Sequence, residues 1–143
     1  MSYQIDELLK ISEYDIYNNP EVSDEGIRKI ADIFYTDKSI DLMEYLDLLK
    51  CSSKFCWMNF LNILEKLPEG DRIRGLPILF ELLKDSNWPT FQKTMEIFET
   101  INKKEVESYL NEYLVQAYAE DDEMWILNMQ LLAKKLNLKI YKI

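Results

Sequence analysis

Histidine is absent from the 143 residues of this chain. Its absence removes the most common general base, the most common metal ligand and the usual pH switch. A catalytic triad or a zinc hydrolase site is therefore hard to build. The chain also has only three glycines, and they form none of the glycine-rich phosphate-binding motifs. We expect a protein that is not an enzyme and that needs no metal or cofactor.

Glycine and proline, at three and four residues, are too scarce for the many tight turns of a barrel or sandwich. Hydrophobic residues make up 48% of the chain, which is enough for a core. No apolar run approaches the ~20 residues of a membrane span. The opening segment MSYQIDELLK lacks the features of a signal peptide. These features predict a cytoplasmic, all-α protein with a single domain over residues 1–143.

The chain has two cysteines, Cys51 and Cys56. In a reducing compartment a structural disulfide between them is rare. As a metal site the pair lacks further soft ligands, and as a redox pair it lacks the usual two-residue spacing. We interpret both as small buried hydrophobic residues.

Apolar residues recur at helical spacing in eight segments separated by short polar breaks. The predicted helices cover residues 3–17, 24–35, 38–49, 53–67, 71–84, 89–101, 103–118 and 123–136. The second has an apolar stripe of Ile27, Ile30, Ala31 and Phe34, and the third has a stripe predicted to be buried, of Leu42, Met43, Leu46 and Leu49. Ser23 is the predicted N-cap of the second helix, and Asn137 is predicted to end the last. Pro77 fits the first turn of a helix that begins near Leu76. The final residues, 137–143, alternate apolar and polar, and fit either a short strand or a loose apolar tail.

Three tryptophans, Trp57, Trp88 and Trp125, each follow an apolar segment and a polar break and then open another apolar segment. Their spacings of 31 and 37 residues are typical of stacked helix pairs. We therefore expect a HEAT-like stack of about four antiparallel helix pairs. The tryptophans are predicted to pack between its layers, although large aromatic residues can also anchor a partner.

The net charge of −9 is unevenly spread, because residues 1–50 hold 12 of the 26 acids and only 5 of the 17 bases. A negative field repels phosphate backbones and so disfavours nucleic acid as a partner. It attracts basic proteins and speeds their encounter. The alternative is that the acidity only keeps the protein soluble.

Two acidic groups are candidate partner-binding surfaces. The first consists of Asp37, Asp41, Glu44 and Asp47, of which the last three follow one side of a predicted helix. The second consists of Glu120, Asp121, Asp122 and Glu123, placed where the last helix begins. A solvated helix face would also explain the first group, and helix capping the second. Capping engages one carboxylate and leaves the others exposed, so both roles are compatible in the second group.

Several short motifs resemble known bacterial families. Between Trp57 and Asn102 the chain carries Leu64-Glu65, Leu76-Pro77, Trp88 and Ile101-Asn102 in an order similar to that of small all-helical immunity proteins of polymorphic toxin systems. The segments DSNWP and EDDEMWILNMQLLAKKL also resemble uncharacterised bacterial HEAT-like domains. The resemblance implies an antitoxin role, in which the protein blocks a cognate toxin without chemistry of its own. It assigns no binding residue.

The sequence therefore predicts a protein-binding function, most specifically immunity to a toxin by occlusion. The partner would be a basic toxin domain, such as a nuclease whose active site attracts phosphate. A general helical-repeat scaffold or adaptor without a toxin partner is the alternative. Helical-repeat DNA glycosylases share the expected architecture, but they need a basic groove rather than an acidic surface.

Overall fold

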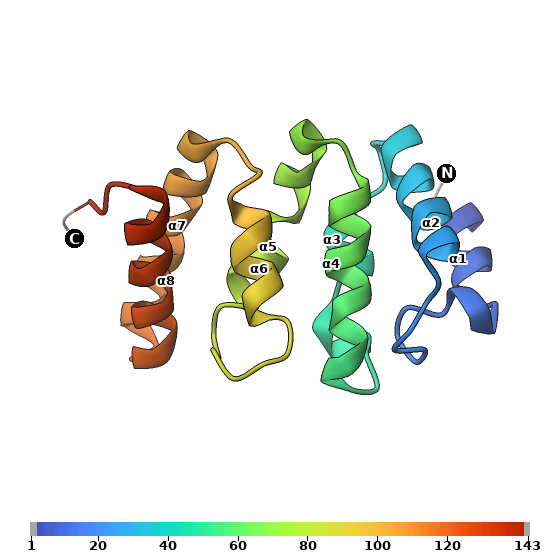
Figure 1. Cartoon of the computed structure of the whole chain (residues 1–143), viewed down its shortest axis with the longest axis horizontal. Coiled ribbons are helices and arrows are strands. Elements are labelled where there is room, and N and C mark those ends of the chain that lie inside the picture. Colours follow the sequence, from blue (N-terminus) through green and yellow to red (C-terminus); the bar gives the residue numbers. More distant parts are fainter. Residues whose placement is uncertain (1–2, 142–143) are drawn as a thin grey trace. The chain divides into compact units, whose positions relative to one another are not determined.

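The computed structural model describes residues 3–141, which contain helices and turns but no strand (Figure 1). The all-α class is thus confirmed over that range. The chain divides into two compact units, Met1–Gly75 and Leu76–Ile143, which are described separately. The expectation of a single domain stays a prediction, because compactness does not show whether either unit folds alone. Within residues 3–141, the helices are too short or too polar to traverse a lipid bilayer.

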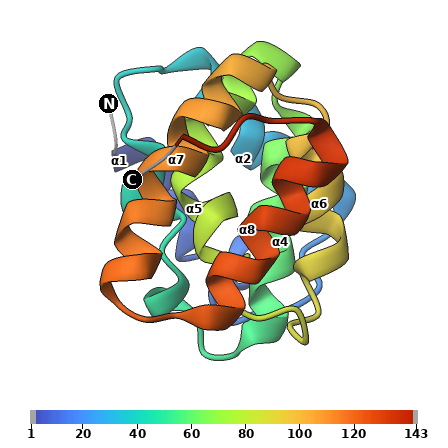
Figure 2. The same cartoon turned by 90° about the vertical axis from the view of Figure 1, so that its left-hand side faces the viewer.

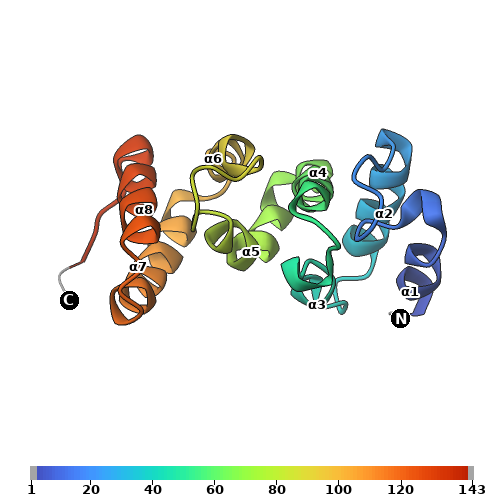
Figure 3. The same cartoon turned by 90° about the horizontal axis from the view of Figure 1, so that it is seen from below.

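The first unit contains four α-helices, and four 3₁₀ turns lie between or after them. The helices are α1 (Tyr3–Leu9), α2 (Asp24–Thr36), α3 (Leu42–Tyr45) and α4 (Trp57–Lys66); the turns are Ser12–Tyr14, Leu48–Lys50, Lys54–Cys56 and Glu69–Gly75. Helix α2 packs against α4, as the view from below also shows (Figure 3). Their inner faces form the core of the unit, with Ile30, Phe34, Phe60 and Leu64 completely buried.

The start of α2 follows the prediction closely. The Ser23 hydroxyl accepts a hydrogen bond from the Gly26 N–H at 3.1 Å. It satisfies one of the amides that a helix leaves unpaired in its first turn. The predicted apolar stripe of this helix, Ile27, Ile30, Ala31 and Phe34, is buried.

Three predicted helices of this unit are shorter than expected, and the one predicted over 53–67 begins only at Trp57, after a 3₁₀ turn. The helix predicted over residues 3–17 ends at Leu9, and the Asp15 carboxylate accepts hydrogen bonds from the amides of Tyr17 and Asn18. The helix predicted over 38–49 is reduced to α3 and a separate 3₁₀ turn. Leu49, predicted to be buried, is 93% exposed. Within residues 3–17 and 38–49, aspartate side chains bind nearby backbone amides, and such bonds favour turns over continuous helix.

A buried asparagine holds the turn after α1 against α4. Asn59 lies on α4 and is 1% exposed. Its side-chain amide donates to the carbonyl oxygens of Ile16 and Asn19 at 3.1 and 2.8 Å. Because both acceptors belong to an irregular segment, this side chain replaces the hydrogen bonds that a helix would have provided there.

The second unit contains α5 (Leu76–Glu81), α6 (Phe91–Phe98), α7 (Lys103–Ala119) and α8 (Glu123–Leu136). Pro77 occupies the first turn of α5, as predicted. Helices α7 and α8 lie side by side and antiparallel (Figure 2). Their connection is tight because Asp121 adopts a left-handed conformation with φ of 52°. Asn137, with φ of 58°, ends α8 at the predicted position.

Trp125 is the central aromatic residue of the second unit. It is completely buried, and its indole N–H donates to the Phe80 carbonyl at 2.9 Å. One turn later the Asn128 amide donates to the Leu83 carbonyl at 2.6 Å. These bonds tie α8 to the carboxyl end of α5 and the residues after it, where carbonyl groups lack partners within the helix.

The other two tryptophans, Trp57 and Trp88, are only half-buried. Among the three, complete burial in a core is confirmed for Trp125 alone. The recurrent position in the sequence thus does not give the three indoles a common environment.

The segment after α8 is extended but pairs with no strand. Its backbone runs beside α7, where Lys139 N–H donates to the Glu107 carboxylate at 2.6 Å. Asn111 donates to the Lys139 carbonyl at 3.0 Å and accepts from Tyr141 N–H at 2.7 Å. Residues 138–141 therefore form neither the short strand nor the loose tail that the sequence left open, because side chains of α7 bind their backbone. The remainder of the predicted segment, 142–143, lies outside the described residues.

Candidate protein-binding surfaces

The first candidate surface is the acidic strip, defined as Asp37, Asp41, Glu44 and Asp47. These residues come from three consecutive local elements and not from one helix face. Asp37 follows the last residue of α2, Asp41 is the N-cap of α3, and Asp47 is the N-cap of the next 3₁₀ turn. Asp41 and Glu44 are exposed, whereas Asp37 and Asp47 are half-buried.

Three of the four carboxylates also shape the backbone of the strip. Asp37 accepts from both the N–H and the hydroxyl of Ser39, at 3.1 and 2.5 Å. Asp41 accepts from Met43 N–H at 3.1 Å, and Asp47 accepts from Leu49 N–H at 2.9 Å. These three carboxylates therefore determine the turns of the segment.

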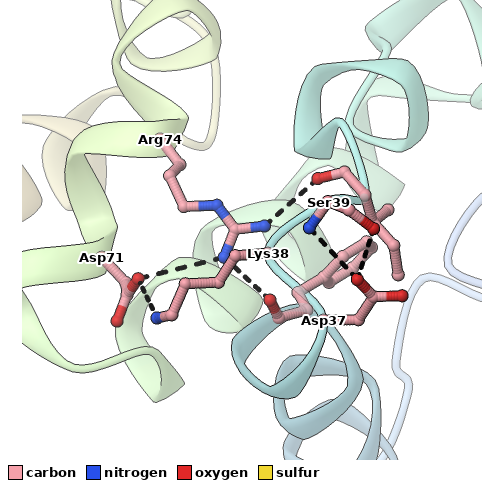
Figure 4. Close-up of polar contacts among 7 residues, drawn as sticks. Asp37, Lys38, Ser39, Asp71 and Arg74 are labelled. Carbon is pink, nitrogen blue, oxygen red and sulfur yellow. Dashed lines mark hydrogen bonds and ion pairs between the residues drawn. The ribbon is translucent and has the colours of Figure 1, made fainter. Parts of the chain in front are cut away.

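Arg74 and Asp71 support the strip from the Glu69–Gly75 turn (Figure 4). The Arg74 guanidinium donates to the Phe34 carbonyl at 2.8 Å and to the Ile40 carbonyl at 3.3 Å. Asp71 forms an ion pair with Lys38, whose Nζ lies 2.6 Å from the carboxylate. The segment between Asp37 and Asp41 is thereby fixed at both of its ends.

Arg72 plays a similar part for α4. Its Nε donates to the carbonyls of Leu64 and Leu67, both at 3.1 Å, and its Nη2 donates to the Glu65 carbonyl at 2.8 Å. A cation there satisfies the last carbonyls of a helix and complements its dipole. Close approach also requires a glycine at position 75, since a Cβ there would lie 2.5 Å from a methyl group of Leu64.

The structural roles of Arg72 and Arg74 were missed at the sequence level. Residues 71–84 were assigned to one helix, in which these arginines would lie on a surface. The available signal was the segment DRIR directly after the helix-ending Pro68-Glu69-Gly70. Basic residues just past a helix end commonly bind its terminal carbonyls.

An exposed apolar side chain lies within the segment of the strip. Leu49 is 93% exposed and its amide is bound by Asp47. Next to it, Lys50 donates through Nζ to the Glu44 carbonyl at 2.7 Å, which holds the segment against α3. An apolar side chain among charges is the usual composition of a protein interface, where an apolar centre has a polar rim.

The second candidate surface is the acidic turn, defined as Glu120, Asp121, Asp122 and Glu123. Asp122 accepts from Trp125 N–H at 3.1 Å and is the N-cap of α8. Glu120 accepts from the Gln116 amide at 2.8 Å. Glu120, Asp121 and Glu123 are exposed. This confirms that one carboxylate of the group caps the helix while the other three stay accessible. The acidic strip and the acidic turn belong to different units.

No cluster of cysteine and acidic side chains within residues 3–141 could hold a metal ion. Cys56 is buried, Cys51 is half-buried, and both are free thiols. Burial raises the pKa of the Cys51 thiol to about 12, with smaller contributions from Cys56, Asp47 and Asp15. A thiol that stays protonated is a poor nucleophile, which agrees with a structural role for Cys51.

Comparison with protein-family models, curated proteins and solved structures gave no match to this chain.

Proposed function

We propose that this chain is a protein-binding protein, specifically an immunity protein that covers the active site of a bacterial toxin. The observation that carries the proposal is the combination of the acidic strip with the exposed Leu49. Four carboxylates and one apolar side chain that is 93% exposed lie between residues 37 and 49, and Arg74 binds carbonyl groups of Phe34 and Ile40 at the start of this segment.

This combination supports both recognition and affinity. Exposed carboxylates increase the rate at which a basic partner is encountered, and the charge of −9 for the whole chain acts in the same direction. An apolar side chain that enters a pocket of the partner supplies desolvation energy at the centre of the contact. A nuclease toxin is a suitable partner, because a site that binds phosphate must be basic.

As the framework of this surface we propose a HEAT-like stack of about four antiparallel helix pairs. The antiparallel α7 and α8 supply one such pair, and the packing of α2 on α4 supplies contacts between neighbouring helices. In a stack of this kind the outer residues are free to diverge, because each pair is held by its neighbours.

The first experiment identifies the partner. An immunity gene lies beside the gene for its toxin, so the products of the adjoining genes are tested for binding to the purified chain. Binding and inhibition of a toxic product support the proposal. If none of them binds, the immunity function is wrong and the general adaptor becomes the better explanation.

The second experiment tests the acidic strip by removing its charges and keeping its turns. The variant D37N/D41N/E44Q/D47N retains side chains that can cap helices and turns. We expect association with the partner to slow by about tenfold or more, and its salt dependence to flatten, because steering depends on these charges. Leu49→Ala should instead speed dissociation.

A matched control separates the strip from the overall charge. The variant E13Q/E21Q/E25Q/D32N removes the same number of charges from the same unit. It should slow association much less than the strip variant does. Equal slowing by both variants would show that only net charge matters, and no change in either would exclude the strip as the contact surface.

A further inference from the structure

The outer side of α8 carries a row of exposed apolar residues that the proposed toxin surface does not use. Met124, Leu127 and Leu131 are 43%, 63% and 50% exposed. Their spacing of three and four residues places them on one side of the helix. The residues that α8 buries, including Trp125, Met129 and Leu132, lie on its opposite side. We call these three exposed residues the α8 stripe.

Charged residues of opposite sign lie at the two ends of the α8 stripe. Glu123 precedes it in the first turn of the helix, and Lys134 and Lys135 follow it in the last turn. Lys135 is 3.7 Å from the Glu99 carboxylate, so Lys134 is the lysine better placed to bind another molecule. Along α8 the surface is therefore first acidic, then apolar and then basic.

We propose that the α8 stripe binds a second copy of this chain, with the two α8 helices antiparallel about a two-fold axis. A two-fold axis brings the same surface of both copies together, so the surface must complement itself. With the axis near Leu127, Met124 of one copy faces Leu131 of the other. Glu123 of one copy then lies two residues, or about 3 Å along the helix axis, from Lys134 of the other, an offset that the two long side chains can bridge. The two helix dipoles oppose each other.

This self-complementarity favours a second copy over other occupants. A basic toxin would meet Lys134 and Lys135 at one end of the stripe, and an acidic protein would meet Glu123 at the other. A row of three apolar residues on a helix is also larger than the isolated hydrophobic side chains that are normal on a surface. An antiparallel helix with the same arrangement satisfies both charged ends and covers the apolar centre.

The dimer should be weak. One helix face buries less than the roughly 800 Å² per partner that stable interfaces bury. The net charge of −9 on each copy adds repulsion. We expect a dissociation constant on the order of 10⁻⁴ M, so that dimers are detected only in concentrated solution.

Sedimentation equilibrium tests the proposal at about 20 to 500 µM protein, a range that spans the expected dissociation constant. The wild-type chain should show a monomer–dimer equilibrium, and Leu127→Glu should remain monomeric at the highest concentration. The control is Ile11→Glu, a change to the same residue at a 46% exposed aliphatic position of the other unit, outside both candidate surfaces. It should dimerise like the wild type. Circular dichroism checks that both variants fold. A wild-type chain that stays monomeric, or equal loss of dimer in both variants, overturns the proposal.

A charge exchange tests the orientation of the helices. Glu123→Lys and Lys134→Glu should each weaken the dimer, because each places like charges opposite one another. The double variant E123K/K134E should restore most of the association, since every pair is then reversed. Failure to restore it would exclude the antiparallel arrangement. None of these measurements needs a toxin, so their outcome is independent of the proposed immunity function.

Discussion

Removing the Arg74 guanidinium should destabilise the first unit and loosen the segment that bears the acidic strip. Arg74→Met keeps the length of the side chain but removes both hydrogen bonds to the carbonyls of Phe34 and Ile40. The Arg74 side chain is only 18% exposed, so water can replace those bonds only in part. A hydrogen bond from a charged donor contributes about 1.5–3 kcal/mol. Because the second bond is long, at 3.3 Å, we expect the free energy of unfolding of the first unit to fall by about 2–3 kcal/mol in total.

The loss is best measured by native-state hydrogen exchange, since the two units need not unfold together. Some amides of α2 exchange only when the first unit unfolds. They should exchange about 30 to 100 times faster in Arg74→Met, since each 1.4 kcal/mol is a factor of ten. Amides of α7 and α8 should change much less. Arg74→Lys should recover part of the loss, because an ammonium group cannot span both carbonyls as the planar guanidinium does.

Arg28→Met is the matched control. Arg28 forms an exposed ion pair with Asp24 at 3.2 Å, and its side chain is 63% exposed. Exposed pairs of this kind contribute at most about 1 kcal/mol. If Arg74→Met changed α2 exchange no more than Arg28→Met, or if Arg74→Lys matched the wild type, the two-carbonyl contact would not stabilise the unit as argued.

Two further outcomes follow from buried groups. Thr90 is completely buried, and its hydroxyl has no hydrogen-bond partner among the described residues. Thr90→Val should therefore leave the melting temperature unchanged or raise it by up to about 5 °C. A clear decrease of the melting temperature in a thermal scan would contradict this. The raised pKa of Cys51 predicts lower stability in alkali: the unfolded thiol ionises near its ordinary pKa of 9 while the folded thiol holds its proton up to about 12. The free energy of unfolding, measured with urea, should fall more between pH 9 and 12 for the wild type than for Cys51→Ala. Equal pH dependence in the two proteins would refute the assignment.

The parts of the fold that could be predicted from the sequence are those that local chemistry determines. Ser23 caps α2 because its hydroxyl oxygen accepts from an amide of the first turn. Asn137 ends α8 because its left-handed backbone conformation stops the helix. The buried stripe of α2 was also predictable, since burial of one face fixes the helical period.

The errors share a physical cause, which is competition between helix and turn. Asp15 and Asp47 could cap a turn or sit on a helix face, and the sequence pattern alone does not decide between these states. Leu49 shows the consequence, because the helical period placed it inside and the turn leaves it 93% exposed. The residues of the acidic strip were named from the sequence, but their arrangement on three separate elements was not foreseen.

The sequence by itself determined the helical class, the start of α2, the end of α8 and the excess of negative charge, because these depend on residues close together along the chain. The tertiary structure alone decided which polar side chains serve distant carbonyl groups. Arg74 reaches Phe34 and Trp125 reaches Phe80 across 40 and 45 positions. Such bonds form only where packing brings a distant donor to a carbonyl near the end of a helix, and residues close together along the chain do not determine which carbonyl that is.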